Sequence, residues 1–203
     1  MVNEQVLIKD KHRVLKIFLK ISIVLLILIA IVLAIFFLGF FKNEGNKIVL
    51  ENPIKGILFA NTNEAGQVDK QKVIEQGVLE FNEDYLNYII AALGVNNLHK
   101  SYIGYGNPII EMNIDNQAWN SEVVKGALLT KQGATDLEDL KIIMTKQEAV
   151  EALISPNIKE FMKTSVKNGN TQIEMIAGKV ELGSKGYLAM YKELTGEEIA
   201  IDE

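Results

Sequence analysis

Few residues of this chain have the type and spacing that catalysis or metal binding requires. The two histidines, His12 and His99, lie far apart, and the sequence contains neither an H-x-x-x-H nor a G-x-S-x-G motif. The first motif places two histidines on one face of a helix for a zinc ion, and the second exposes a serine nucleophile on a sharp turn. There is also no cysteine, which excludes thiolate nucleophiles, thiolate metal ligands and disulfides.

Two groups of acidic residues remain as candidates. Asp136, Glu138 and Asp139 form either a polar turn or a calcium site, although the ligand spacing of an EF-hand loop is missing. Glu111 and Asp115 alternate with apolar residues, as on the solvent-facing side of a strand. Glycine patterns for phosphate or dinucleotide binding are absent. We therefore expect no catalytic residue, no metal site and no cofactor, and we do not expect an enzyme.

The charge distribution is uneven along the chain. The formal net charge is −5, although five basic residues precede Ile21, so the acidic excess lies in the rest of the protein. Affinity for nucleic acid comes mainly from neutralising phosphates. An acidic domain is a poor match for that task, and we expect no nucleic-acid partner.

A long apolar stretch runs from Ile21 to Phe41 without a charge or a proline. As a helix it would span about 31 Å, close to the hydrocarbon thickness of a bilayer. It therefore predicts a transmembrane helix, although a cleaved signal peptide is the alternative. More basic residues before the stretch than after it favour a single-pass signal-anchor protein of the cell membrane, with its N-terminus cytoplasmic and its C-terminal domain outside. Ala30 and Ala34 could let two such helices approach in a weak homodimer.

Five regions follow from this interpretation. They are a basic cytoplasmic tail (1–20), a transmembrane helix (21–41), a stalk (42–55), an extracytoplasmic α+β domain (56–196) and an acidic tail (197–203).

Capping residues and apolar periodicity predict the helices of the domain. Asn82 caps a helix that Gly94 ends, and Thr145 with Glu148 forms a capping box. Ser155-Pro156 starts a third helix, which Asn168-Gly169 ends, and Ser184 caps a last helix that stops at Gly196.

Alternating or extended patterns predict the strands. They cover Gly56–Thr62, Val73–Phe81, Ile109–Asp115, Trp119–Val123, Ala127–Thr130, Leu140–Met144, Thr171–Ala177 and a continuation at Val180 and Leu182. Strands and helices do not alternate regularly, so the expected fold class is α+β: a single transmembrane helix followed by a mostly antiparallel sheet with helices packed on one face. Asn96–Pro108, with Tyr102 and Tyr105, predicts a loop that is either a rigid turn or part of a binding site.

The C-terminal part of the sequence carries a family resemblance. Its pieces are the strand Asp139–Met144 entering a capped helix, Phe161-Met162 in a second helix, the segment Gly178–Gly186 (GKVELGSKG), and Leu188-Ala189-Met190. This order resembles the lipid-binding domain of sterol carrier proteins over about residues 80–196. The resemblance implies an α+β fold with an apolar cavity and no catalytic residues. Domains of that family are usually soluble, and residues 42–80 have no counterpart in the resemblance.

Methionines are frequent on the predicted interior faces. Methionine is unbranched and adaptable, so it suits a cavity that accepts flexible chains, although ordinary core filling explains it as well. We predict a non-catalytic domain, anchored to the membrane, that binds a lipid or another apolar ligand. The alternative is a structural module that recruits a protein partner at the cell surface. The predicted ligand-binding residues are Phe161, Met162, Met175, Leu188 and Met190.

Overall fold

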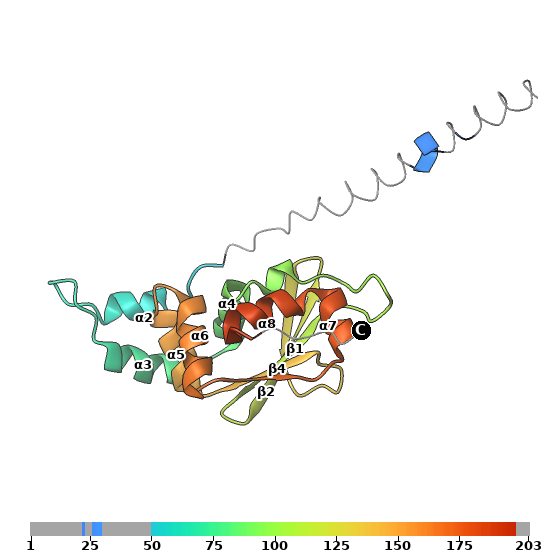
Figure 1. Cartoon of the computed structure of the whole chain (residues 1–203). Coiled ribbons are helices and arrows are strands. Elements are labelled where there is room, and N and C mark those ends of the chain that lie inside the picture. The colour runs from blue at the N-terminus through green and yellow to red at the C-terminus, as the bar shows by residue number, and fades with distance from the viewer. Residues whose placement is uncertain (1–21, 23–25, 30–49, 198–203) are drawn as a thin grey trace, which may run out of the picture. The chain divides into compact units, whose positions relative to one another are not determined.

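The computed structural model describes residues 22, 26–29 and 50–197 (Figure 1). The chain divides into two compact units, residues 1–44 and 45–203. The basic tail, the pair Ala30 and Ala34, most of the predicted span and most of the predicted stalk lie outside the described residues. The predicted location of the domain outside the cell therefore stays a prediction.

The expected fold class is wrong about the transmembrane helix. No helix among the described residues is long and apolar enough to cross a membrane, so the predicted single transmembrane helix is not found. The sheet is mixed, since two of its neighbouring strands run parallel, but its other strand pairs are antiparallel, so it is mostly antiparallel as predicted. The described domain is α+β, with one five-stranded sheet and helices.

The sheet has the strand order β3-β2-β1-β4-β5. Its strands are β1 (Ile109–Ile114), β2 (Gln117–Val124), β3 (Ala127–Gln132), β4 (Leu140–Met144) and β5 (Gln172–Met175). β1, β2 and β3 form an antiparallel meander, while β4 lies parallel to β1 with Met112 opposite Ile142. β5 pairs antiparallel with β4 at one edge. The meander was predicted from the alternating sequence.

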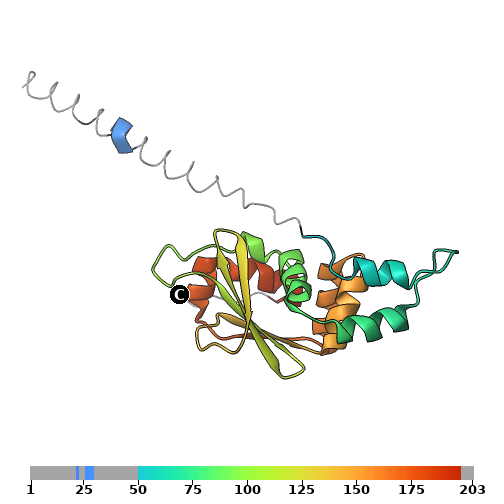
Figure 2. The ribbon, with the colours of Figure 1, turned by 180° about the vertical axis from the view of Figure 1, so that it is seen from behind.

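The helices precede, interrupt and follow the sheet in the chain. They are α2 (Lys55–Ala60), α3 (Lys70–Leu79), α4 (Glu83–Ala92), the short 3-10 helix η1 (Val95–Asn97), α5 (Lys146–Ile154), α6 (Ile158–Asn168), α7 (Lys179–Lys185) and α8 (Tyr187–Thr195). α2, α3 and α5 lie together at one end of the domain, and the two opposite views agree on this arrangement (Figures 1 and 2).

One face of the sheet forms the floor of the core. Successive residues of a strand point to opposite faces, so alternate residues share a face. Ile110, Met112 and Ile114 of β1 are fully buried, and alternate residues of β4 continue this surface. The other face carries polar residues, and Lys141 pairs there with Glu111 at 3.1 Å. The described core lies entirely between Ile54 and Leu194, so the second unit has a complete core of its own and is expected to fold without residues 1–44.

Three predicted strands are helices. Gly56–Thr62 belongs mostly to α2, Val73–Phe81 mostly to α3, and Val180 with Leu182 to α7. In α3, the side chain of Asp69 caps the helix by accepting a hydrogen bond from the backbone N–H of Lys72. In α7, Glu181 and Lys185 form an ion pair four residues apart, which is the spacing of one helical turn.

Most predicted helix ends agree with the structure. Asn82 accepts a hydrogen bond from the backbone N–H of Asp84, and Thr145 accepts one from Glu148. Two starts are displaced: Asn157 rather than Ser155 caps α6, and Gly186 rather than Ser184 precedes α8. The Ser184 hydroxyl instead donates to the carbonyl of Glu181, inside α7.

Candidate functional site

An apolar groove lies among helices α2, α3, α5 and α6. Its volume is about 770 Å³. The groove is lined by Leu58, Val68, Lys70, Ile74, Glu151, Ile154, Ser155, Pro156 and Phe161. Six of these nine residues are apolar, and the helices bring them together from four separate stretches of the chain.

The wall formed by α3 depends on a close helix contact. Gly77 of α3 is buried against Val150 of α5, and a Cβ at Gly77 would lie only 2.7 Å from a methyl group of Val150. The lack of a side chain therefore lets α3 approach α5. Ile74, one turn before Gly77, and Ile154, one turn after Val150, then both line the groove.

The groove can hold a molecule with a long apolar part. Its volume falls within the ~300–1,000 Å³ of typical ligand pockets, and its lining combines apolar walls with a few polar groups. Lys70, Glu151 and Ser155 are the polar lining residues. They could hold a polar head group while the apolar walls cover a chain.

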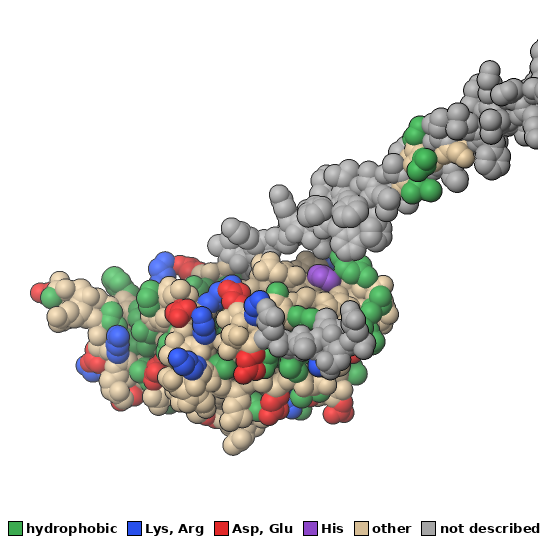
Figure 3. All heavy atoms as spheres, viewed as in Figure 1, with side chains coloured by type: hydrophobic (Ala, Val, Ile, Leu, Met, Phe, Trp, Pro, Cys, Tyr) green, Lys and Arg blue, Asp and Glu red, His purple; other side chains and the backbone are tan. Residues whose placement is uncertain are grey.

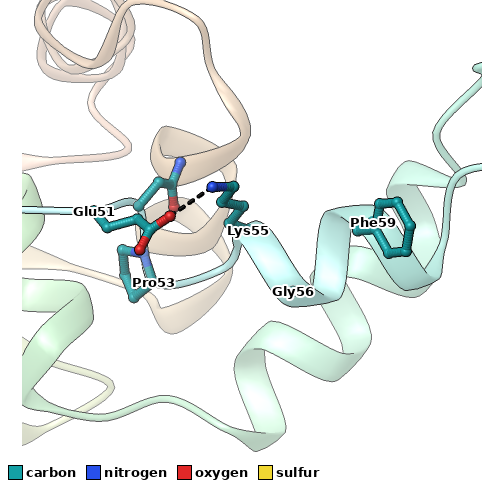
Figure 4. Close-up of a pocket in the computed structure, with 6 residues that line it drawn as sticks. Glu51, Pro53, Lys55, Gly56 and Phe59 are labelled. Carbon is teal, nitrogen blue, oxygen red and sulfur yellow. Dashed lines mark hydrogen bonds and ion pairs between the residues drawn. The ribbon is translucent and has the colours of Figure 1, made fainter.

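A second, shallower pocket of about 560 Å³ lies along α2 (Figure 4). Lys55 and Glu51 form an exposed ion pair at 2.5 Å on its rim. Phe59, further along α2, stands away from this pair and is 85% exposed. Because its apolar and charged groups do not converge, this pocket is the weaker candidate.

The five residues predicted from the sequence to bind a ligand lie in different surroundings. Phe161 lines the groove. Met162 and Met190 are buried in the core, and Leu188 packs against it. Met175, on the edge strand β5, is 37% exposed. The groove contains only Phe161 of this set, and the structure does not test whether any of the five binds a ligand.

A buried polar cluster that was not predicted from the sequence lies beneath the C-terminal helices. Lys185 of α7 lies 2.5 Å from Asp139 Oδ1 and 2.8 Å from Glu181 Oε1. The Tyr187 hydroxyl donates to Asp139 Oδ2 at 3.0 Å, and the backbone N–H of Ile109 donates to the same oxygen at 2.8 Å. The cluster thus joins α7 and α8 to the start of β1 and β4.

Burial is the largest cause of the pKa shifts of Asp139 and Tyr187. It raises the pKa of the Asp139 carboxyl, although hydrogen bonds from Lys185 and Ile109 act in the opposite direction. Burial and the nearby Asp139 raise the pKa of the Tyr187 phenol. Because Asp139, Lys185 and Tyr187 are each at most 2% exposed, their contacts join parts of the protein and are closed to a ligand.

Glu111 and Glu138 are also bound to neighbouring protein groups. Glu111 accepts a hydrogen bond from the backbone N–H of Thr135, and Lys141 lies between Glu111 and Glu138. The hydrogen bond to Glu111 raises the pKa of Lys141. Within the described part of the chain, no three His, Cys, Asp or Glu side chains are placed to hold a metal ion.

Comparison with known proteins identifies no family. No protein-family model and no curated protein matches the chain. Among solved structures, the chain is similar to sterol carrier protein 2 like 2 from Aedes aegypti, with 17% identity, a TM-score of 0.30, and coverage of 52% of this chain and 92% of that one.

A second similar structure is an enzyme. It is the stereoselective inverting sec-alkylsulfatase Pisa1 from Pseudomonas sp., with 12% identity and a TM-score of 0.28. The match covers 66% of this chain but only 17% of that enzyme. With both TM-scores below 0.5, neither similarity establishes a shared fold or function.

Proposed function

We propose that this domain is a non-catalytic binding module that takes up a molecule with a long apolar chain, such as a lipid, in the groove among α2, α3, α5 and α6. The observation that carries this proposal is the convergence of Leu58, Ile74, Ile154 and Phe161 on one groove of about 770 Å³. Covering apolar surface with an apolar chain is favourable at roughly 25 cal/mol per Å².

The polar clusters support a binding role rather than a catalytic one. Asp139, Lys185 and Tyr187 satisfy one another in the interior, and Glu111 and Lys141 are paired on the polar face of the sheet. A catalytic acid or base must reach its substrate within hydrogen-bond distance. The resemblance of the sequence to sterol carrier proteins points to the same class of ligand.

Native mass spectrometry on residues 45–203 tests the proposal. The protein is purified from cells, and its mass is measured before and after extraction with organic solvent. We expect a bound species of lipid mass that extraction removes, and we expect the extracted protein to take up a fluorescent fatty acid in a saturable manner. A protein that carries no such species and takes up no fatty acid or sterol probe would contradict the proposal.

A further inference from the structure

The turn between η1 and β1 displays three large side chains to solvent. Tyr102 is 64% exposed, Ile103 is 62% exposed and Tyr105 is 46% exposed. We call residues Tyr102–Tyr105 the apolar turn. It projects beyond α7 at the end of the domain opposite α2 and α3 (Figures 1 and 2). Figure 3 shows hydrophobic side chains gathered beside His99, the purple residue.

The apolar turn is held in this exposed conformation by specific contacts. The backbone N–H of Ser101 donates to the carbonyl of Gly106 at 2.9 Å, which closes the turn. The buried Ser101 hydroxyl bonds to Ser184 of α7 at 2.8 Å and accepts from the backbone N–H of Ile103 at 3.2 Å. Gly104 has a φ of 100°, which side chains rarely allow. The exposure of the three side chains is thus fixed by the fold.

The charge around the apolar turn differs from that of the whole protein. No acidic residue lies between Asp84 and Glu111, whereas Lys100 is exposed beside the turn. The imidazole of His99 lies 5.0 Å from the ring of Tyr102. At the base of the loop, Glu122 accepts a hydrogen bond from the side chain of Asn107. In a protein of net charge −5, the acid-free stretch 85–110 with its exposed Lys100 is suited to approach an anionic surface.

We propose that the apolar turn docks the domain on the surface of an anionic lipid bilayer. Tyrosine is favoured at the boundary between lipid and water, where its ring contacts lipid and its hydroxyl stays hydrated. Ile103 would enter the boundary between head groups and acyl chains, and Lys100 would lie near the phosphates. This docking does not depend on the groove, because the two sites lie at opposite ends of the domain (Figure 1).

Binding to lipid vesicles tests this docking. Residues 45–203 are used, and co-sedimentation is measured with vesicles of phosphatidylcholine alone and of phosphatidylcholine mixed with phosphatidylserine. We expect binding to the mixed vesicles that weakens with salt. The double variant Tyr102→Ser, Ile103→Ser should bind about tenfold more weakly, because it exposes less apolar surface to the lipid. Lys100→Glu should weaken binding several-fold on the mixed vesicles only.

Leu79→Ser is the matched control, because Leu79 is 86% exposed on α3 at the far end of the domain. It should bind vesicles as the unchanged protein does, and circular dichroism should show every variant folded. Absence of vesicle binding, or equal binding by all variants, would overturn the proposal. One further outcome would overturn the proposal. If the unchanged protein is purified with a stoichiometric protein companion that the double variant loses, while vesicle binding stays the same, the turn contacts a protein.

Discussion

Lys185 and Asp139 form an ion pair across 46 residues of sequence, with 2.5 Å between Nζ and Oδ1 and each side chain only 2% exposed. Asp139 also accepts from Tyr187 and from the backbone of Ile109. The pair therefore ties the C-terminal helices to the sheet. A buried charge that loses its partner is costly, typically by about 3–5 kcal/mol.

Lys185→Met should destabilise the domain by about 3–5 kcal/mol at neutral pH. The cost comes from the carboxylate of Asp139, which stays buried without its cation. A carboxyl group whose pKa is raised in the folded state stabilises the fold most at low pH, where the carboxyl is protonated. This stabilisation is lost as the pH rises through the raised pKa. The deficit of the variant should therefore shrink as pH falls toward the raised pKa of Asp139. Urea unfolding followed by the fluorescence of Trp119, the sole tryptophan, measures this.

Two further variants test whether the stability deficit of Lys185→Met comes from the unpaired carboxylate of Asp139. Adding Asp139→Asn to Lys185→Met removes the unpaired charge and should restore part of the lost stability at neutral pH. Lys159→Met is the control, since Lys159 pairs with Glu193 at 2.9 Å with both side chains about half exposed, and it should cost less than about 1 kcal/mol. A deficit of Lys185→Met that does not change with pH would contradict the assigned role of the pair.

Gly77→Ala should destabilise the domain by about 1–3 kcal/mol, even though alanine favours helices more than glycine does. The new methyl group would collide with Val150, which is fully buried and stiff because it is β-branched. Val150→Ala introduced together with Gly77→Ala should make room for that methyl group. Thermal unfolding of the two single variants and the double variant gives the coupling free energy between the two substitutions. If their effects on stability simply add, the contact between Gly77 and Val150 is not tight.

Thr145→Ala should lower the free energy of unfolding by about 1 kcal/mol, since it removes the side chain that caps α5. Thr164→Ala is the matched control, because the exposed hydroxyl of Thr164 donates to the carbonyl of Glu160 within α6 and caps no helix end. It should change stability by only a few tenths of a kcal/mol. Equal losses in the two variants, measured by urea unfolding, would argue against the capping role of Thr145.

Local patterns predicted the parts of the fold that local interactions determine. The caps at Asn82 and Thr145 are properties of neighbouring residues, as is the alternation of Ile110, Met112 and Ile114. The segment around Gly77 was predicted as a strand because it is rich in β-branched residues, which favour strands. The glycine itself is explained by its close contact with Val150, more than 70 residues away in the sequence. In α7, the four-residue spacing of Glu181 and Lys185 could have indicated the helix.

The sites could be predicted less completely than the elements. Phe161 was selected as part of the Phe161-Met162 pair that resembles sterol carrier proteins, and it lines the groove. Leu58 and Ile74 were missed because their segments were predicted as strands, so no common face with Ile154 could be inferred. The pairing of Asp139 with Lys185 depends on the path of the whole chain between them, which residue spacing does not encode.

The measurement that tests the binding groove most directly compares two tryptophan substitutions on the same helix. Ile74→Trp places a larger side chain in the groove, whereas Leu79→Trp adds the same side chain at an 86% exposed position. Fluorescence polarisation of a labelled fatty acid is titrated with extracted residues 45–203 and with each variant, after circular dichroism confirms that all are folded. Ile74→Trp should weaken the affinity at least about tenfold, the equivalent of 1.4 kcal/mol, while Leu79→Trp binds as the unchanged protein does. Equal affinities for all three proteins would contradict the assignment of the groove as the binding site.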